Sequence, residues 1–363
     1  MKVTFVCVSL RPGGTERIIS LLASSLREKY SITIVLLSSA PIFYNIPAGV
    51  NVVSPDISSR SNTGLTWYPK IFFFLMRTLH SVKPNLVLSF GETISPFVVL
   101  ASKIMGAKVI VFNRANPYSS LTGVRGFLNP VLFTLAECVV VQTQRAVDIL
   151  SKRYRFVKFS VMPNPVEVPK EVKPIEQRGK SIINVGMLGG LKNQRALISA
   201  FANTSGTREW RLVLVGDGPD RGALQQLCKD LRVDDYVDFL GERNDVFALL
   251  QNSRIFVFSS LSEGFPNALL EALAAGCACI SFDCPTGPSE LIVNNFNGLL
   301  VENANEEALL CQLDALMQND EVQTRLAKSA REKITIYSRD RVIDDLERLL
   351  EHTCNSRSNG ESV

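Results

Sequence analysis

Short apolar runs alternate with amphipathic segments along the first half of the chain. Runs rich in β-branched residues predict strands, and the 3.6-residue spacing of apolar positions predicts a helix over Glu16–Glu28. The predicted strands are Val3–Val8, Ser31–Leu37, Leu86–Ser89, Lys108–Phe112 and Cys138–Gln142. Strands that alternate with helices imply a parallel sheet with right-handed crossovers.

A second alternating series follows a proline-rich linker that begins at Pro163-Asn-Pro165. Its predicted strands are Ser181–Val185, Trp210–Val215, Tyr236–Phe239, Arg254–Phe258 and Ala278–Phe282. Its predicted helices are Asn193–Ala202, Arg221–Leu231, Pro266–Ala275, Glu306–Met317, Glu321–Ile334 and Arg339–His352. We therefore expect two Rossmann-like α/β domains, residues 1–165 and 166–338, facing across a cleft. The last helix, 339–352, is expected to pack back on the first domain, and 353–363 to form a disordered tail.

The composition favours a cytoplasmic globular protein. Among 363 residues, no apolar stretch approaches the ~20 residues that a spanning helix needs. The start of the chain has no small-residue cleavage site and is typical of a first strand. Cys277, Cys279 and Cys284 form the one cysteine cluster, but it lacks histidines, so buried thiols beside a strand are favoured over a zinc site.

Charge is distributed unevenly between the two halves. Residues 1–165 carry 18 Lys and Arg against 6 Asp and Glu, a net charge of +12, whereas the remainder carries a net charge of −8. The basic half is expected to meet an anionic partner, which nucleic acid, anionic lipid or a phosphorylated acceptor would each satisfy. The segment from Thr66 to Lys83 mixes aromatic and basic residues and suits either an anionic bilayer surface or a core-packed helix.

Two acidic residues flank a predicted helix start in the second half. Glu263 follows the strand that ends at Phe258, and Glu271 lies about one turn inside the next helix. Ligands of open parallel sheets bind outside the carboxyl ends of strands, and backbone N–H groups at a helix start suit phosphate. Spacing alone leaves two interpretations open: a ligand site for hydroxyl groups, or an exposed acid and an ordinary loop acid.

The segment from Ser262 to Cys277 resembles the Glu-x7-Glu signature of glycosyltransferase family 4, whose members are retaining enzymes of the GT-B fold. Further resemblances occur in matching order over roughly 300 residues. They are Leu10-Arg-Pro-Gly-Gly-Thr-Glu-Arg17, Asn184-Val-Gly-Met-Leu-Gly-Gly-Leu-Lys-Asn193, Val215-Gly-Asp-Gly-Pro219 and Gly287-Pro-Ser-Glu290. The loop style of the first half resembles members that build bacterial surface polysaccharides.

The resemblance implies a role for each matching residue. Glu271 would accept hydrogen bonds from the ribose hydroxyls of the donor, and Glu263 would contact hydroxyls of the transferred sugar near the reacting centre. Lys192 would neutralise the diphosphate as the glycosidic bond breaks, which makes Glu263 and Lys192 the expected catalytic pair. The implied donor-binding residues are Gly13, Gly14, Gly186, Lys192, Gly264, Phe265, Pro266, Asn267, Ala268 and Glu271.

Two positions depart from the family pattern. An arginine usually stands five residues before the lysine, where this chain has Met187, so one charge partner of the diphosphate is missing unless Arg17 or Arg114 replaces it. Many members also have a histidine after the fourth strand, but the only histidines here, His80 and His352, fall in predicted helices. Arg17, Glu92 and Arg114 are further candidate contacts for donor or acceptor.

The implied reaction moves a hexose or N-acetylhexosamine, with a UDP-sugar favoured, to a glycan acceptor on a polyprenyl diphosphate, at the cytoplasmic face of the inner membrane. The pathway implied is that of O-antigen, capsule or exopolysaccharide. In same-face transfer the departing phosphate helps to deprotonate the acceptor. With no Asp-x-Asp in the sequence, we expect no metal and no cofactor. Peripheral contact with anionic lipid is expected, and a nucleic acid partner is not.

Three other functions remain as alternatives. Met187 favours a catalytically impaired subunit that binds nucleotide sugars. Gly216-Asp-Gly-Pro-Asp-Arg-Gly222, with Asp238 after it, is a loose variant of the fingerprint of nicotinamide-dependent oxidoreductases, but Asp217 and Asp220 would repel a pyrophosphate. A nucleic-acid-binding module would explain the basic half, and its binding would fade steeply with salt.

Overall fold

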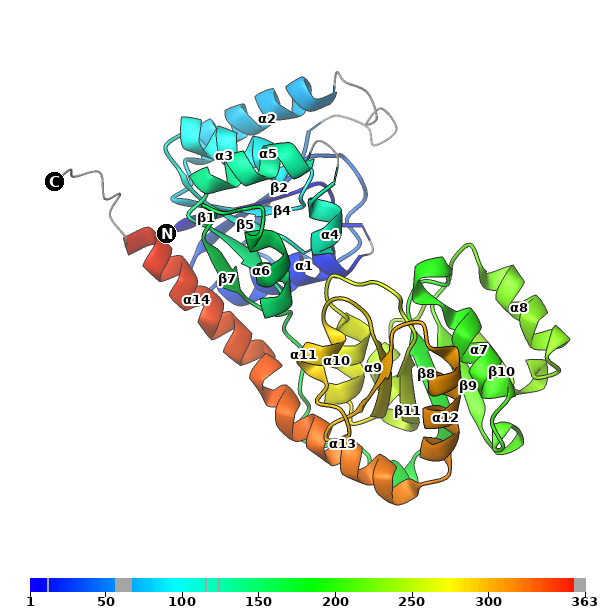
Figure 1. Ribbon diagram of the computed structural model, residues 1–363. Coiled ribbons are helices and arrows are strands. Elements are labelled where there is room, and N and C mark those ends of the chain that lie inside the picture. The colour runs from blue at the N-terminus through cyan, green and yellow to red at the C-terminus, as the bar shows by residue number, and fades with distance from the viewer. Residues whose placement is uncertain (12, 56–66, 115, 123–124, 356–363) are drawn as a thin grey trace. The chain divides into compact units, whose positions relative to one another are not determined.

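The computed structural model describes residues 1–11, 13–55, 67–114, 116–122 and 125–355 (Figure 1). The chain divides into two compact units: unit 1 comprises Met1–Pro165 and Asp340–Val363, and unit 2 comprises Val166–Arg339. Of the expected disordered tail, residues 353–355 instead continue the last helix, and 356–363 lie outside the described residues. Thr66 of the aromatic and basic segment also lies outside them.

Unit 1 contains a seven-stranded parallel sheet in the order β3-β2-β1-β4-β5-β6-β7. The strands are β1 (Lys2–Cys7), β2 (Ser31–Leu36), β3 (Asn51–Val53), β4 (Leu86–Phe90), β5 (Lys108–Phe112), β6 (Cys138–Val141) and β7 (Phe159–Val161). All five predicted strands are present. Sequence reasoning missed β3 and β7, because each is a three-residue edge strand with little burial and hence little hydrophobic signal.

Helices cover both faces of the unit 1 sheet (Figure 1). They are α1 (Gly14–Leu26), α2 (Trp67–Val82), α3 (Ser95–Ile104), α4 (Pro117–Ser120), α5 (Arg125–Leu132), α6 (Gln144–Ser151) and α14 (Arg339–Asn355), with the 3₁₀ turn η2 (Phe133–Leu135) after α5. Successive strand residues point to opposite faces, so Phe5 packs with α1 and α14, whereas Val6 packs with α2 and α3. Four residues of α14 join the core cluster that contains Phe5: Val342, Ile343, Leu346 and Leu350.

Unit 2 repeats the architecture with a six-stranded parallel sheet in the order β10-β9-β8-β11-β12-β13. The strands are β8 (Gly179–Val185), β9 (Arg211–Val215), β10 (Val237–Gly241), β11 (Ser253–Phe258), β12 (Ala278–Asp283) and β13 (Leu299–Glu302). The helices are α7 (Gln194–Ala202), α8 (Arg221–Asp230), α9 (Val246–Asn252), α10 (Asn267–Ala274), α11 (Pro288–Leu291), α12 (Glu306–Met317) and α13 (Asp320–Ile334). Apolar side chains on both faces of the sheet form the unit's two core clusters.

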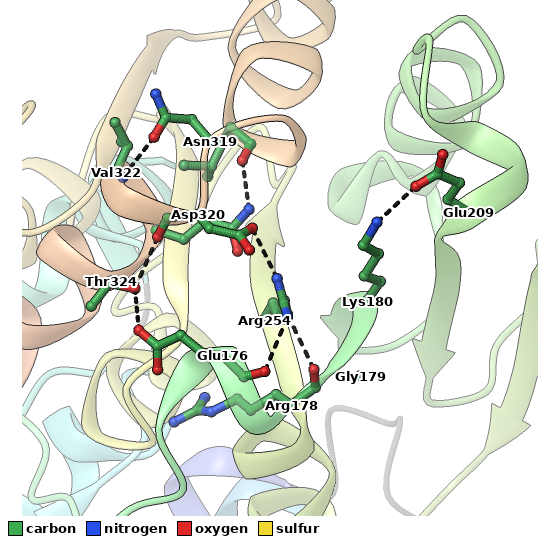
Figure 2. Close-up of polar contacts among 12 residues, drawn as sticks. Glu176, Arg178, Gly179, Lys180, Glu209, Arg254, Asn319, Asp320, Val322 and Thr324 are labelled. Carbon is green, nitrogen blue, oxygen red and sulfur yellow. Dashed lines mark hydrogen bonds and ion pairs between the residues drawn. The ribbon is translucent and has the colours of Figure 1, made fainter.

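Two buried arginines tie the linker to the edge of this sheet where the strands begin. Arg178 donates to the backbone carbonyls of Lys173, Ser253 and Ala275. Arg254 donates to the carbonyls of Arg178 and Glu176 and pairs with the carboxylate of Asp320 at 2.9 Å, as Figure 2 shows. A cavity of about 530 Å³ lies beside this network, and none of the predicted site residues lines it.

Candidate functional site

The strand order reverses between β8 and β11, which lie side by side at the centre of the unit 2 sheet. From β8 the chain proceeds outward through β9 and β10, and after β11 it proceeds in the other direction through β12 and β13. The loops that leave two such neighbouring strands diverge, which opens a binding crevice at their carboxyl ends. The loop after β8 contains Lys192, and the loop after β11 contains Glu263.

Lys192 and Glu263 form an ion pair at this point of reversal. The Lys192 Nζ lies 2.5 Å from the Glu263 Oε1, and the two side chains are 28% and 14% exposed. The same Nζ lies 5.8 Å from the centre of the Phe258 ring, at the end of β11. The Lys192 carbonyl accepts from the Ser259 hydroxyl at 2.8 Å, so backbone as well as side chain joins the two loops. The structure thus brings together the two residues that sequence analysis selected as the catalytic pair.

Two buried, hydrogen-bonded side-chain amides hold the loop after β8 in place. The Asn184 side chain donates to the Val257 carbonyl at 2.9 Å, and the Gln194 side chain donates to the Met187 carbonyl at 3.0 Å and to the Asn184 amide oxygen at 3.4 Å. Both side chains are buried. Sequence analysis did not select Gln194, because a glutamine at a helix start gives no signal of a partner ten residues earlier.

A glycine after β9 allows close approach to the loop after β8. The Gly186 N–H donates to the Val215 carbonyl at 2.9 Å, which joins the ends of β8 and β9. A Cβ at Gly216, where φ is +128°, would come within 2.0 Å of the Gly186 carbonyl oxygen. Met187 is 60% exposed, so its side chain projects away from the core.

The late loop packs against the segment between Glu263 and α10. The Thr286 hydroxyl, fully buried, donates to the Glu263 carbonyl. A Cβ on Gly287, whose φ is +103°, would lie 2.3 Å from the Pro266 Cδ, so only a glycine fits there without movement. Thr286 was missed by sequence analysis; its position next to the recognised Gly287 motif was the available signal.

The segment from Glu263 to Glu271, which sequence analysis selected for donor binding, is largely built into the fold. The side chains of Phe265 and Pro266 are buried, and the Asn267 N–H donates to the Phe265 carbonyl at 3.1 Å. Gly264, Asn267 and Ala268 are half-buried. Helix α10 begins at Asn267, and Glu271, one turn later, is half-buried among buried neighbours. Glu263 therefore lies before the start of α10 and Glu271 lies after it, as the spacing predicted.

The corresponding place in unit 1 is where β1 and β4 lie side by side. Gly13 closes the loop after β1, and Gly14 begins α1. The Gly13 N–H donates to the Tyr44 hydroxyl at 2.9 Å, and that hydroxyl donates to the Gly13 carbonyl at 2.8 Å. Sequence analysis missed Tyr44, which lies 31 residues from Gly13 in a loop. The Arg17 side chain is exposed one turn into the helix.

Glu92 and Arg114 follow the ends of β4 and β5. Glu92 is buried and accepts from the Ser120 hydroxyl, which in turn accepts from the Asn113 amide at 3.2 Å. The guanidinium of Arg114 lies 5.4 Å from the centre of the Phe112 ring and donates to the Asn164 side chain. Burial lowers the pKa of Arg114 to about 9, which leaves it protonated at pH 7.

The remaining candidate features have structural explanations. Cys277, Cys279 and Cys284 are buried, and burial raises the pKa of Cys277 to about 12. Within the described residues, no three His, Cys, Asp or Glu side chains are grouped so that they could hold a metal ion. Asp238 pairs with Arg211 at 2.5 Å. This ion pair engages the carboxylate that would have to bind the ribose of a nicotinamide cofactor if the chain were an oxidoreductase.

Comparisons with known proteins agree with this geometry. Residues 167–333 match the family described as "Glycosyl transferases group 1". An uncharacterised glycosyltransferase of Methanocaldococcus jannaschii is 30% identical over 272 residues, which cover 66% of each chain. The chain belongs to the group 1 glycosyl transferases.

Two further comparisons cover nearly the whole chain. A glycosyltransferase of Campylobacter jejuni, named N-acetylgalactosamine-N,N'-diacetylbacillosaminyl-diphospho-undecaprenol 4-alpha-N-acetylgalactosaminyltransferase, is 25% identical over 95% of this chain and 98% of its own. The crystal structure of Anabaena HepE in complex with UDP superposes with a TM-score of 0.81, at 18% identity, over 97% of this chain and 100% of that one. The GT-B fold, with two Rossmann-like domains, is therefore confirmed. Glycosyl transferases of this group use nucleotide sugars as substrates.

Proposed function

We propose that this glycosyltransferase moves a hexose or N-acetylhexosamine, with retention, from a UDP-sugar to a hydroxyl of a polyprenyl-diphosphate-linked glycan. The observation that carries the proposal is the ion pair of Lys192 and Glu263 at the point where the strand order of unit 2 reverses. Unit 2 would bind the nucleotide sugar, and unit 1, with its excess of basic residues, would bind the acceptor. The Campylobacter relative, whose name states an undecaprenol-linked acceptor, supports the acceptor class.

In this proposal Lys192 acts on the leaving group. Its ammonium is held by one carboxylate and keeps part of its surface exposed, so the diphosphate of a donor competes with Glu263 for the same charge. The released Glu263 then accepts hydrogen bonds from the sugar, while Glu271 accepts hydrogen bonds from the ribose. Charge on the diphosphate grows as the bond to the sugar C1 breaks, and a fixed ammonium stabilises that charge most in the transition state.

The transfer occurs on one face of the sugar. The C1–O bond to the diphosphate breaks, the acceptor oxygen bonds to C1 on the same face, and the departing phosphate oxygen takes the proton of the acceptor hydroxyl. No protein base is needed for this proton. Product analysis by NMR tests the stereochemistry: the new glycosidic bond should keep the anomeric configuration of the donor, and inversion would contradict the proposal.

Surface polysaccharide assembly, in O-antigen, capsule or exopolysaccharide, is the proposed setting, at the cytoplasmic face of the inner membrane. Within the described residues, no helix has both the length and the apolar character needed to cross a bilayer. Access to a lipid-linked acceptor would therefore come from peripheral contact with anionic lipid.

A panel of UDP-, GDP- and ADP-sugars tests the donor assignment. Calorimetric titration and hydrolysis assays should show saturable binding and slow hydrolysis with at least one UDP-sugar. If no nucleotide sugar binds, the proposed function is wrong. Binding without transfer to any lipid-linked acceptor would favour the alternative of a catalytically impaired subunit, for which exposed Met187 in place of the family's arginine is the specific observation.

A further inference from the structure

Large apolar side chains project outward from one layer of unit 1. Phe73 on α2 is 73% exposed, Phe127 on α5 is 74% exposed, and Phe156 in the turn between α6 and β7 is 86% exposed. Other exposed apolar side chains lie on α2, α3, α5 and η2: Tyr68, Leu100, Ile104, Leu128, Val131 and Leu135. We call these nine residues the apolar face. Exposing this much apolar surface to water is unfavourable in free energy, and a contiguous apolar patch of this kind marks an interaction surface.

Packing between the elements makes the face continuous. Tyr68 of α2 stacks on Phe97 of α3, with ring centres 5.2 Å apart, and α3 in turn packs against α5. The guanidinium of Arg153 lies 5.3 Å from the centre of the Phe127 ring, which brings the turn that carries Phe156 beside α5. Figure 1 shows α2, α3 and α5 lying side by side.

The inner sides of the same helices explain why the outer side is not simply misplaced core. Trp67, Ile71 and Leu75 of α2 are buried against the sheet, so the helix needs no further apolar residue for folding. Of the two interpretations of this segment from the sequence, core packing is confirmed, and bilayer contact stays a prediction; α2 also exposes Tyr68 and Phe73.

Positive charge surrounds the apolar face. Exposed basic side chains lie on or just after the helices that carry it: Lys70 and Arg77 of α2, Lys83 just after α2, and Lys103 of α3. The turn that carries Phe156 adds exposed Lys152, Arg153, Arg155 and Lys158. Of the described acids between residues 67 and 158, Glu92 is buried, Glu137 pairs with Lys103 at 2.8 Å, and Asp148 accepts from Gln144 at 3.2 Å.

We propose that the apolar face docks on the headgroup region of an anionic bilayer. Apolar tips surrounded by lysine and arginine match a bilayer surface, where hydrocarbon meets negative charge, and each basic residue near that surface adds to the attraction. Single-stranded nucleic acid fits less well, because five of the nine residues are aliphatic and have no ring on which a base could stack. The proposal rests on the lipid-linked acceptor proposed above, because docking brings the protein to such a substrate.

Vesicle co-sedimentation of the full chain tests the proposal. The parent should bind vesicles of phosphatidylglycerol and phosphatidylcholine, bind pure phosphatidylcholine weakly, and lose binding as salt rises. The double variant Phe127→Ser/Phe156→Ser should weaken the partition coefficient by about tenfold, since two apolar side chains no longer leave water. Arg155→Gln/Lys158→Gln should weaken binding to the anionic vesicles only. Parent protein that stays in solution with both kinds of vesicle would overturn the proposal.

Matched variants in unit 2 supply the controls. Phe296→Ser removes a half-exposed phenylalanine outside the apolar face, and Lys229→Gln/Lys328→Gln removes two exposed charges. These variants should bind vesicles like the parent. If they lose binding as much as the unit 1 variants do, general charge or hydrophobicity is responsible and the assigned face is wrong. A random single-stranded RNA that binds the parent at physiological salt, and loses binding with the same unit 1 variants, would also overturn the proposal.

Assays in detergent separate this proposal from the proposed function. With a short-chain, water-soluble acceptor, Phe127→Ser/Phe156→Ser should transfer sugar at the parent rate, but with a long-chain acceptor in vesicles it should be about tenfold slower. Vesicle binding without any sugar transfer would support the docking face and contradict the function. Transfer to both acceptors without vesicle binding would do the reverse.

Discussion

Unit 1 and unit 2 share one strand order but differ in what they present to solvent and in how their central loops are held. In unit 2 the loops after β8 and β11 are joined by the charges of Lys192 and Glu263, whereas in unit 1 the loop after β1 is held by the neutral hydroxyl of Tyr44. Among the described residues, the large exposed hydrophobic side chains of unit 2 are scattered over its loops and edges, whereas seven of the sixteen in unit 1 lie on the adjacent helices α2, α3 and α5. The shared fold therefore determines where a binding site can lie, whereas the side chains at that place determine which ligand or surface it can bind.

The largest effect is expected from breaking the charged pair of unit 2. Glu263→Gln should lower turnover by about 10²–10³-fold and change donor affinity much less, because the contact strengthens in the transition state. Steady-state kinetics with the UDP-sugar that binds measure both terms. Glu209→Gln breaks the exposed pair with Lys180, at 2.7 Å in the same unit, and should leave kcat unchanged. Equal losses in the two variants would show that Glu263 has no special role.

The next effect concerns a glycine of each unit. Gly287→Ala should lower the free energy of unfolding by about 2–3 kcal/mol, because it adds both a strained φ and a clash with Pro266. Gly49→Ala in unit 1 adds only the strain of φ +91°, with no atom within 4 Å of the new Cβ, and should cost about 1 kcal/mol. Urea unfolding curves measure both. Equal losses would show that the late loop moves aside without cost.

Donor affinity should respond to the second glutamate. Glu271→Ala should weaken binding of the UDP-sugar by about tenfold, since it removes the acceptor proposed for the ribose hydroxyls. Calorimetric titration measures the change, and Glu307→Ala, at an exposed position of α12, is the control. Unchanged affinity in Glu271→Ala would place the ribose elsewhere.

A smaller effect is expected from the neutral contact of unit 1. Tyr44→Phe removes both hydrogen bonds to Gly13 and should cost about 0.5–1 kcal/mol, seen as a loss of about two- to fivefold in kcat/KM. Tyr118→Phe changes an exposed tyrosine of the same unit and should have no effect. If Tyr44→Phe matches the parent, the loop after β1 does not depend on that hydroxyl for activity.

The smallest effect is expected at the departure from the family pattern. Met187→Arg should leave activity unchanged or raise it a few-fold, because the exposed side chain contributes little to packing and an arginine adds a diphosphate partner. Initial rates at low donor concentration would detect the gain. Total loss of activity would mean that the methionine makes a contact that the reaction requires.

Much of this molecule could be predicted from the chain alone, for physical reasons that also set the limits. Long apolar runs such as Lys108–Phe112 identify buried strands because parallel sheets are covered on both faces. Lys192 and Glu263 could be selected because the motifs around them resemble those of a known family, whereas their 2.5 Å contact, between residues 71 positions apart, required the structure. Tyr44 and Thr286 could not be selected, because single hydroxyls in loops leave no periodic pattern. The apolar face required the structure, since the sequence of α2 does not separate its inner from its outer phenylalanines.

The return of the last helix to unit 1 has a consequence for how the protein folds while it is being synthesised. Val342, Leu346 and Leu350 complete a core that begins with Val3 and Phe5, so the two ends of the polypeptide must meet before that core is closed. During translation unit 2 has all its residues before unit 1 does, and the first 165 residues leave the ribosome with one side of their sheet still lacking α14. A 1–165 fragment produced by itself is therefore expected to aggregate, whereas joining the two ends through a new linker would shorten the longest chain closure in folding.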